Sequence, residues 1–401
     1  EVAINPQTTN WQVSYDGRRN EPICLPVKFP LVLAQGVEGI AVGLATKILP
    51  HNFVELIQAS IKVLEGKKFK LYPDFQTGGM MDAGDYQSGL RGGKIRVRVK
   101  IDKLDKSTLV IREIPYGVTT GTLMESIVKA SEKGQIKIKK LSDNTAAEVE
   151  VLIELQPGVS PDQTIDALYA FTQCETSISP NSCVIIDNKP VFLAVEEILR
   201  QSTYYTQELL RQELTIRLGE LQEKWHFASL EKIFIEKRIY RDIEESETWE
   251  DVIDVIGLGL AKYIATPSSK TKGDKRLLLH RDITVEDIQR LTEIRIKRIS
   301  KYNSFQADEL ILGIETELTQ VRHDLAHLTE YTIAYFQRLL DKYGKGRERK
   351  TEITTFDTIQ AAKVIASNAK LYVDRKEGFI GYGLKKDEFV TDCSEIDDII
   401  A

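Results

Sequence analysis

The sequence predicts an α+β protein: a mixed α/β domain, then a long antiparallel pair of helices with a small helical head, then a short β segment. Three patterns lead to this class. Charged and apolar residues alternate strictly from Lys94 to Ile101, which indicates a half-buried strand. Two apolar stripes with steps of three and four residues begin at Leu210 and Leu310 and indicate paired helices. The strand-like pieces at 366–400 are too few for a complete domain.

The composition describes a soluble globular protein, because 42% of the 401 residues are apolar and 28% are charged. Two or three domains fit this length. No apolar run approaches the roughly 18 residues of a membrane span, so no membrane role is expected. The four cysteines lie far apart without a C-x-x-C pair, which argues against a zinc site or disulfide framework and fits a reducing cytoplasm. The first residue, Glu1, has no leader after it and suggests that part of the native protein precedes this chain.

Charge is distributed unevenly along the chain. The net charge is −6, yet the stretch from Arg91 to Lys140 has thirteen Lys and Arg against five Asp and Glu. This excess points to a local surface for a polyanion. No acidic partner strand is evident for the cationic face of the alternating strand, so nucleic-acid contact is expected there. That face consists of Lys94, Arg96, Arg98 and Lys100.

The remaining elements of the α/β domain follow in order. Asn52 is a suitable N-cap for a helix from Phe53 to Leu64. The sequence then predicts a strand at 108–114, a helix at 122–131, and strands at 136–139 and 148–155. Lys137 and Lys139 have two open alternatives, DNA contact or cross-strand pairing. The acidic candidates for such pairs are Glu148, Glu150 and Glu154.

The glycine-rich segment from Gln35 to Thr46 has three glycines within eight residues, so its backbone can turn tightly and approach a large partner. One interpretation is that it presents Ile40 as a wedge. The other is a buried strand with glycines at a bend, in which Ile40 belongs to the core. The pattern alone favours the buried strand.

Two long helices follow. Their stripes are Leu210, Leu214, Leu218, Leu221, Trp225 and Ala228, and Leu310, Ile314, Leu318, Val321, Leu325 and Leu328. The matching seams predict an antiparallel coiled coil with a head between its helices. The mixed apolar pattern at 291–299 either covers the tip of this stalk or meets another subunit. His323 and His327 are either a helix-surface pair or two ligands of a metal site without an identified third.

A survey for catalytic machinery finds no self-contained active site. The glycine-rich segment lacks the Lys-Ser/Thr of a phosphate loop, and neither G-x-S-x-G nor H-E-x-x-H occurs. Asp82 and Asp85 could hold a metal, although carboxylates that cap turns are commoner. No metal site is therefore assigned.

Several motifs together point to one family. They are Tyr15-Asp16-Gly17, Leu25-Pro26-Val27-Lys28-Phe29-Pro30, Gly36-x-x-Gly39-Ile40-Ala41-Val42-Gly43-Leu44-Ala45-Thr46-Lys47-Ile48-x-Pro50-His51-Asn52, Pro73-Asp74-Phe75-x-Thr77-Gly78-Gly79, Arg91-Gly92-Gly93-Lys94, Glu113-Ile114-Pro115-Tyr116, Gly344-Lys345 and Arg349-Lys350-Thr351-Glu352-Ile353. In order and spacing, over nearly the whole chain, they resemble the A subunit of bacterial type IIA DNA topoisomerases. Topoisomerase IV resembles the chain more closely than gyrase does.

The resemblance implies a division of the chain into six parts. These are a linker from a winged-helix domain (1–20), a tower domain (21–195), a first coiled-coil helix (196–248), a helical gate head (249–303), a return helix (304–344), and a hinge with the start of a C-terminal β domain (345–401).

The resemblance also implies a function: the DNA-binding, DNA-bending and gate portion of an ATP-dependent isomerase that passes one duplex through another. The implied setting is the cytoplasm, on the chromosome. The implied partners are duplex DNA, a second copy and the B subunit, in an A2B2 complex whose B subunit holds Mg²⁺ and ATP. No cofactor, metal or catalytic residue is assigned to this chain.

The family's nucleophilic tyrosine precedes the Tyr15-Asp16-Gly17 motif, so the chain is expected to lack it and to be unable to cleave DNA alone. The stretch Thr203-Tyr204-Tyr205-Thr206-Gln207 resembles the context of that tyrosine superficially. It falls where the first long helix begins, so it is not expected to be catalytic.

By the same resemblance, Ile40 is the residue that intercalates between bases. The residues expected to bind DNA are Lys28, Gln35, Gly36, Gly39, Lys47, Arg91, Lys94, Arg96 and Arg98. An anionic Glu38 near phosphate would be unfavourable unless a cation is paired with it. The gate between two subunits is expected at Leu291, Ile294, Arg295, Arg298 and Tyr302.

Two other functions remain open. A non-catalytic coiled-coil scaffold or chromosome-architecture protein would bind DNA through the basic strands without supporting relaxation. A small-molecule enzyme could bind phosphate with the glycine-rich segment, but the missing Lys-Ser/Thr disfavours this.

Overall fold

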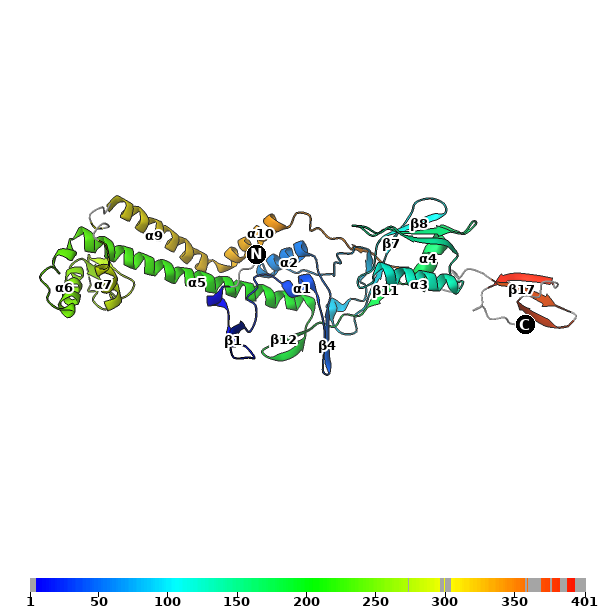
Figure 1. The fold of residues 1–401 in the computed structure, drawn as a ribbon, viewed down its shortest axis with the longest axis horizontal. Coiled ribbons are helices and arrows are strands. Elements are labelled where there is room, and N and C mark those ends of the chain that lie inside the picture. The colour runs from blue at the N-terminus through cyan, green and yellow to red at the C-terminus, as the bar shows by residue number, and fades with distance from the viewer. Residues whose placement is uncertain are drawn as a thin grey trace. The chain divides into compact units, whose positions relative to one another are not determined.

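The computed structural model describes residues 5–272, 274–295, 299, 304–357, 359, 369–375, 377–382 and 388–393. The fold is mixed α+β, as the sequence predicts (Figure 1). The chain forms two compact units, each assembled from segments that are distant in sequence. We call residues 29–203 and 336–401 the sheet unit, and residues 1–28 and 204–335 the helical unit.

The first sheet of the sheet unit has the strand order β11 (Glu175–Ile178), β6 (Ile95–Arg98), β5 (Met80–Asp82), β16 (Glu352–Ile353). Its core includes side chains from α1 (Leu31–Gln35) and α2 (Phe53–Leu64). The helix α2 has the predicted bounds, because Asn52 Oδ1 accepts hydrogen bonds from the first backbone N–H groups of the helix. The strand β16 pairs in parallel with β5, although it lies near the opposite end of the chain.

The second sheet of this unit has the order β7 (Lys100–Lys103), β8 (Thr108–Glu113), β10 (Val151–Leu155), β9 (Ile138–Asp143). Helices α3 (Thr120–Glu132) and α4 (Pro161–Phe171) pack against it (Figure 1). Apolar residues of both helices and of all four strands line the resulting core.

The strand predicted from Lys94 to Ile101 is in fact two strands in two sheets. After β6 ends, the N–H of Val99 donates to Cys174 O (2.9 Å), and β7 then pairs with β8. A register irregularity between Lys100 and Ile101 accompanies the change of partner. The four cations of this stretch therefore do not share one face of one sheet.

Two ribbons and a small sheet are also found among the described residues of the sheet unit. One ribbon pairs β3 (Val37–Ala41) with β4 (Leu44–Ile48), and the other pairs β12 (Cys183–Ile186) with β13 (Lys189–Phe192). Near the C-terminus β18 (Phe379–Tyr382), β17 (Ala369–Asp374) and β19 (Glu388–Cys393) form an antiparallel sheet. The short helix η2 (Gln87–Gly89) lies between β5 and β6.

In the helical unit, α5 (Val195–Glu236) contributes its residues from Tyr204 onward and packs along α9 (Ser304–Ala326). Their seam contains five buried residues of the predicted stripes: Leu214, Leu221, Ile314, Leu318 and Val321. Arg217 of α5 pairs with Glu317 of α9 (2.6 Å), and Trp225 Nε1, further along α5, donates to Glu315 (2.9 Å). Later residues of α5 thus contact earlier residues of α9. The two helices therefore run antiparallel.

The return helix is interrupted at His327, between α9 and α10 (Leu328–Tyr343). The His327 ring stacks on His323 (centroids 4.3 Å apart), and its Nδ1 donates to His323 O (3.0 Å). Within the part of the chain that the structure describes, no three His, Cys, Asp or Glu side chains are grouped to hold a metal. The pair thus takes part in local contacts at the end of α9.

The head of the helical unit contains η3 (Ile239–Arg241), α6 (Trp249–Ala261), α7 (Val285–Thr292) and the strand pair β14 (Ile264–Ala265) with β15 (Leu277–Leu278). These elements pack on the end of α5 through one apolar core. A hairpin of β1 (Trp11–Val13) and β2 (Asn20–Pro22) follows η1 (Pro6–Thr8) in the N-terminal part of the unit. None of the described helices is long and apolar enough to cross a membrane.

Candidate nucleic-acid interface

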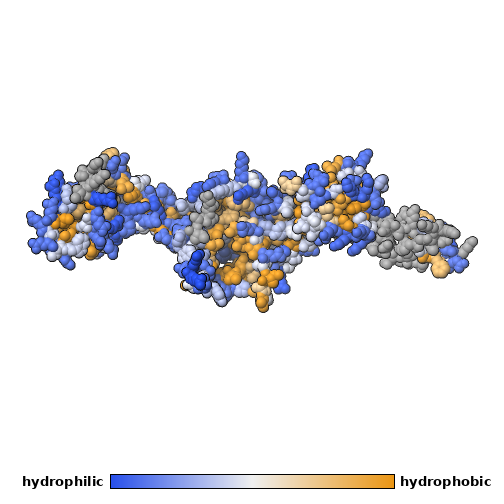
Figure 2. Space-filling view, viewed as in Figure 1, coloured by the Kyte–Doolittle hydropathy of each residue, from blue (hydrophilic) through white to orange (hydrophobic). Residues whose placement is uncertain are grey.

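The ribbon β3–β4 carries the most exposed apolar side chains of the sheet unit. Its strands pair from Val37 opposite Ile48 to Ala41 opposite Leu44, and Val42 and Gly43 form the tip. Exposure rises along the ribbon, from a buried Ile48 at the root to Ile40, which is 91% exposed near the tip. Figure 2 shows the apolar tip as an orange projection at the lower edge of the view. The buried-strand interpretation of Ile40 is therefore wrong.

Glycine is required at the root of this ribbon. Gly36 has φ +71°, and a Cβ there would lie 2.8 Å from Ile48 O and 2.9 Å from Pro50 N. Both the left-handed conformation and the close approach exclude a larger residue. Gly36 thus allows the chain to turn into the ribbon close to Ile48 and Pro50. Gly39 lies within β3 and is half-buried.

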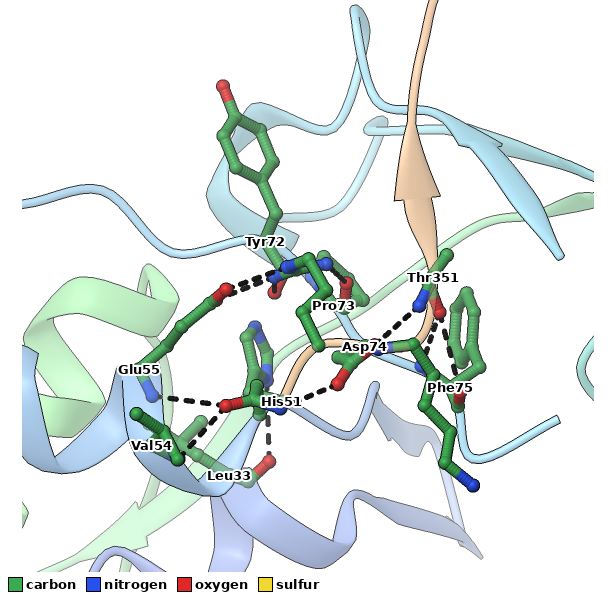
Figure 3. A network of polar contacts seen from close by, with 12 residues as sticks. Leu33, His51, Val54, Glu55, Tyr72, Pro73, Asp74, Phe75 and Thr351 are labelled. Carbon is green, nitrogen blue, oxygen red and sulfur yellow. Dashed lines mark hydrogen bonds and ion pairs between the residues drawn. The ribbon is translucent and has the colours of Figure 1, made fainter. Parts of the chain in front are cut away.

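A buried histidine joins the ribbon root to the core (Figure 3). Both the backbone N–H of His51 (2.8 Å) and its Nδ1 (3.3 Å) approach Leu33 O, a carbonyl that can only accept. Nδ1 therefore carries the proton, and Nε2 accepts from Tyr86 Oη (3.3 Å). Burial lowers the pKa of His51 to about 4, so the ring is neutral at physiological pH.

The C-terminal motif Arg349–Ile353 is bound into the same region (Figure 3). Arg349 makes two hydrogen bonds to Glu55 (2.6 and 2.7 Å), and Asp74 accepts from the backbone N–H of Thr351 (2.9 Å). Thr351 Oγ1 accepts from Phe75 N–H (2.7 Å). Motifs that are far apart in sequence thus form one support for the ribbon.

The charges on the ribbon are paired with each other. Lys47 Nζ lies 3.0 Å from Glu38 Oε1, across the ladder on which these two residues are directly opposite. This pairing removes the objection to an anionic Glu38 near phosphate, and it also reduces the free positive charge of Lys47. Gln35 is exposed at the end of α1, next to the ribbon root.

The expectation that Arg98 faces DNA without an acidic partner is wrong. Arg98 Nε donates to Glu175 on β11 (2.6 Å), and the guanidinium stacks on Phe356 (4.2 Å to the ring centroid). Arg98 is buried and therefore serves the core. Arg96 is also paired, with Asp82 (2.7 Å) and Glu175 (3.7 Å), but its side chain remains 29% exposed.

Arg91 and Lys94 are exposed, and their side chains have no partner among the described residues. They lie on the loop after η2. The end of η2, from which this loop starts, is joined to segment 181–183 through Ser182 N–H, which donates to Gly89 O (3.0 Å). Of the predicted DNA-binding cations in the sheet unit, these two keep their charge most available.

Two further lysines are engaged in ion pairs. In the helical unit, Lys28 lies 2.7 Å from Glu213 of α5, so its charge is already compensated. In the second sheet, Lys139 pairs with Glu154 (3.3 Å), as the cross-strand alternative predicts.

The predicted gate residues have different environments. Leu291 is 1% exposed and belongs to the core of the head, because the apolar face of α7 points inward. It is therefore not a surface residue of this chain. Ile294 is half-buried against the same core, and Arg295 is exposed. Arg298 and Tyr302 lie outside the described residues.

Sequence reasoning assigned no role to two polar residues, Thr46 on β4 of the ribbon and Asn181 next to it. They are 135 residues apart and meet through direct hydrogen bonds between β4 and segment 181–183. No short-range pattern could have found this contact. The stretch Thr203–Gln207 lies within α5, as its position predicted.

The sheet unit thus has an exposed apolar tip on a hydrogen-bonded root, together with two exposed cations, Arg91 and Lys94. Proteins that unstack and bend a duplex use exposed apolar side chains and cations of this kind. Comparison with known proteins gives the class. A family model that describes the A subunit of DNA gyrase/topoisomerase IV matches residues 2–337. The chain therefore belongs to the family formed by the A subunits of DNA gyrase and topoisomerase IV.

Among its relatives, the A subunit of DNA topoisomerase 4 from Borreliella burgdorferi is 35% identical over 400 residues, which is all of this chain and 62% of that protein. The DNA gyrase A subunit of Lawsonia intracellularis is 30% identical over 334 residues, 79% of this chain and 38% of the relative. The DNA gyrase A subunit of Aminobacterium colombiense is 27% identical over 409 residues, 94% of this chain and 46% of the relative. The chain spans less than two thirds of the length of these relatives.

Proposed function

We propose that this chain is the DNA-binding, DNA-bending and gate portion of the A subunit of a type II DNA topoisomerase. The observation that carries the proposal is the 91% exposure of Ile40 at the end of a supported ribbon, in a member of this family. An exposed aliphatic residue at such a tip has little structural use. It suits insertion between stacked bases.

Insertion of Ile40 would unstack one base step at a cost of a few kcal/mol, which contacts along the bent duplex offset. The cations best suited to those contacts are Arg91 and Lys94, with Arg96 contributing through its exposed part. Gln35, Gly36 and Gly39 would lie beside the sugar-phosphate walls. Lys47 would act as half of an ion pair with Glu38.

We further infer that the paired helices α5 and α9 are a coiled-coil stalk and that the head forms a gate with a second copy. Support comes from the buried seam and from apolar side chains on the head surface, including Leu258, Leu277 and Leu278. Together with Arg295 these residues could form a self-complementary contact about a two-fold axis.

The whole enzyme would be an A2B2 complex in the cytoplasm, acting on chromosomal DNA. The B subunit would hold Mg²⁺ and hydrolyse ATP, while this chain would supply the DNA seat and the exit gate. Relaxation or decatenation would then follow from passage of a second duplex.

The test is an assay of the native gene product with the B subunit, ATP, Mg²⁺ and supercoiled DNA. ATP-dependent relaxation supports the proposal, and Ile40→Ala should reduce it with little change in thermal stability. DNA binding without relaxation would favour the non-catalytic scaffold instead.

A further inference from the structure

The wedge ribbon needs support from the side. An isolated two-stranded ribbon is at best marginally stable in water, because its own ladder does not offset the entropy of ordering it. The residues of β3–β4 near the tip are exposed, so they have few apolar contacts of their own. A wedge on a loose ribbon would have to be ordered during insertion, which weakens binding.

The structure provides such support along β4. The backbone N–H of Lys47 donates to Asn181 O (2.9 Å), and the N–H of Asn181 donates to Lys47 O (3.0 Å). These two bonds form one antiparallel bridge, after which no further backbone bridge between β4 and β12 is present in the described ladders.

Nearer the tip than that bridge, hydrogen bonds from side chains link β4 to segment 181–183. Thr46 Oγ1 donates to Cys183 O (2.9 Å) and accepts from Cys183 N–H (3.2 Å), so one hydroxyl satisfies both backbone groups of that residue. Asn181 Nδ2 donates to Ala45 O (2.6 Å), which is two residues nearer the tip than the bridge. Thr46 and Asn181 thus extend the support toward Ile40, since Ala45 is the ladder partner of Ile40.

The segment that receives these bonds is itself fixed. Ser182 is buried, its N–H donates to Gly89 O (3.0 Å), and its carbonyl accepts from Leu193 N–H (3.2 Å). Val184 packs against the core of the first sheet. The support is therefore anchored to the core and to the end of η2, which the loop with Arg91 and Lys94 follows.

We propose that Thr46 and Asn181 are positioning residues that hold the wedge ribbon in the conformation that inserts Ile40 into DNA. The inference rests on the proposed function of Ile40. Neither residue is required to touch the DNA. They keep the tip ordered before binding, so that less conformational entropy is lost when the duplex bends.

The test uses Thr46→Val and Asn181→Ala in the native gene product assembled with its B subunit. Valine has nearly the shape of threonine but leaves both backbone groups of Cys183 without the hydroxyl. Bending of a short duplex labelled at both ends is measured by fluorescence energy transfer, with affinity measured at several salt concentrations. We expect about fivefold to tenfold weaker bending-competent binding for each variant.

Two readouts separate positioning from other roles. The slope of log affinity against log salt should stay unchanged, because no phosphate contact is lost. Thr46→Ser keeps the hydroxyl and should restore bending. A reduced salt slope, or failure of serine to restore bending, would overturn the proposal, as would wild-type bending in both variants.

A double-mutant cycle distinguishes failure of this inference from failure of the proposed function. If Thr46 acts through Ile40, adding Thr46→Val to Ile40→Ala should cause no further loss of bending. Additive losses would overturn the positioning role while leaving the wedge in place. If Ile40→Ala alone bends DNA normally, the proposed function fails first. If the Thr46→Val variant does not fold, the same double-mutant cycle with Asn181→Ala and Ile40→Ala tests the positioning role.

Discussion

At the scale of single residues, the same side-chain type has opposite uses in this chain depending on its neighbours. Ile40 and Ile48 lie on the two strands of one ribbon, but only Ile48 reaches the core. Arg91 and Arg98 lie within eight positions of each other, and only Arg98 is buried in an ion pair. The effect of a substitution should therefore follow environment and not residue type.

Ile40→Ala should change the free energy of unfolding by less than about 0.5 kcal/mol, because little apolar surface is lost from the interior. It should also lower DNA bending by the assembled enzyme. Thermal melting and fluorescence energy transfer measure the two effects. A loss of several degrees in melting temperature would show that Ile40 contributes to the core.

Arg98→Ala should destabilise the fold by about 3 kcal/mol, because Glu175 loses its principal partner in a buried site. Arg91→Ala is the matched control on the surface. It should leave stability unchanged and lower the salt slope of DNA binding by about one unit. Denaturant titration and affinity measurements at several salt concentrations test the pair. Equal effects on stability would contradict these assignments.

Sequence reasoning could recognise the motif around Ile40 but could not decide between wedge and core by pattern. Both environments accept isoleucine, and exposure depends on what the rest of the chain leaves uncovered. For Arg98 the alternating pattern gave a wrong prediction, because the acidic partner Glu175 is on β11. In the sequence, the strands of the second sheet lie between β6 and β11. Local alternation carries no information about such a distant partner.

At the scale of elements, the ribbon root and the helix pair show how local signals and long-range packing combine. The helix after the N-cap Asn52 and the pairing of the two long helices could be predicted from the sequence, because caps and apolar stripes are short-range patterns. The interruption at His327 was not, because the stripe continues across it without a change of step.

Acid should weaken the ribbon root through His51. Its pKa is about 4 in the folded chain and about 6.5 when unfolded, so the unfolded chain binds a proton that the folded chain excludes. Stability from this group is complete above pH 6.5 and declines toward pH 4, by about 2 kcal/mol at pH 5. Thermal melting at several pH values measures the decline.

His51→Gln is the control for this effect, because the amide can also donate to Leu33 O but does not titrate. The variant should melt with a flatter pH dependence than the native protein between pH 7 and pH 5. An identical pH profile in both proteins would show that His51 is not the group responsible.

Leu221→Ala should cost about 3 kcal/mol, because Leu221 is 2% exposed in the seam of α5 and α9. Leu310→Ala, in the second predicted stripe but 57% exposed, should be nearly neutral. Chemical denaturation compares them. Similar losses of unfolding free energy in the two variants would mean that Leu310 is also buried in the seam.

At the scale of the whole molecule, the chain alternates between its two units. The sheet unit begins at Phe29, gives way at Tyr204 to the helical unit, and resumes at Phe336. The motifs at 344–353 supported the resemblance to the family, but they did not reveal the structural role of this segment. A basic stretch with glycines is typical of a hinge, so a hinge was expected there. In the structure Arg349 and Thr351 complete the ribbon support, and β16 completes the first sheet.

If the head forms a gate with a second copy, sedimentation should show a dimer whose stability depends on the apolar head surface. Leu258→Glu should weaken it, because a charge on an exposed position at the contact opposes association without disturbing the core. A monomer at concentrations of roughly tens of micromolar would count against the gate.

The late arrival of β16 also affects how the chain is made. During synthesis β5 leaves the ribosome long before its parallel neighbour Glu352–Ile353 exists, so one edge of the first sheet stays uncovered while residues 204–335 of the helical unit are translated. Exposed edges of this kind recruit other strands and promote aggregation. The first sheet can therefore be completed only after residue 353 has been synthesised, and a nascent chain that stalls before residue 352 should aggregate more readily than one that stalls after it.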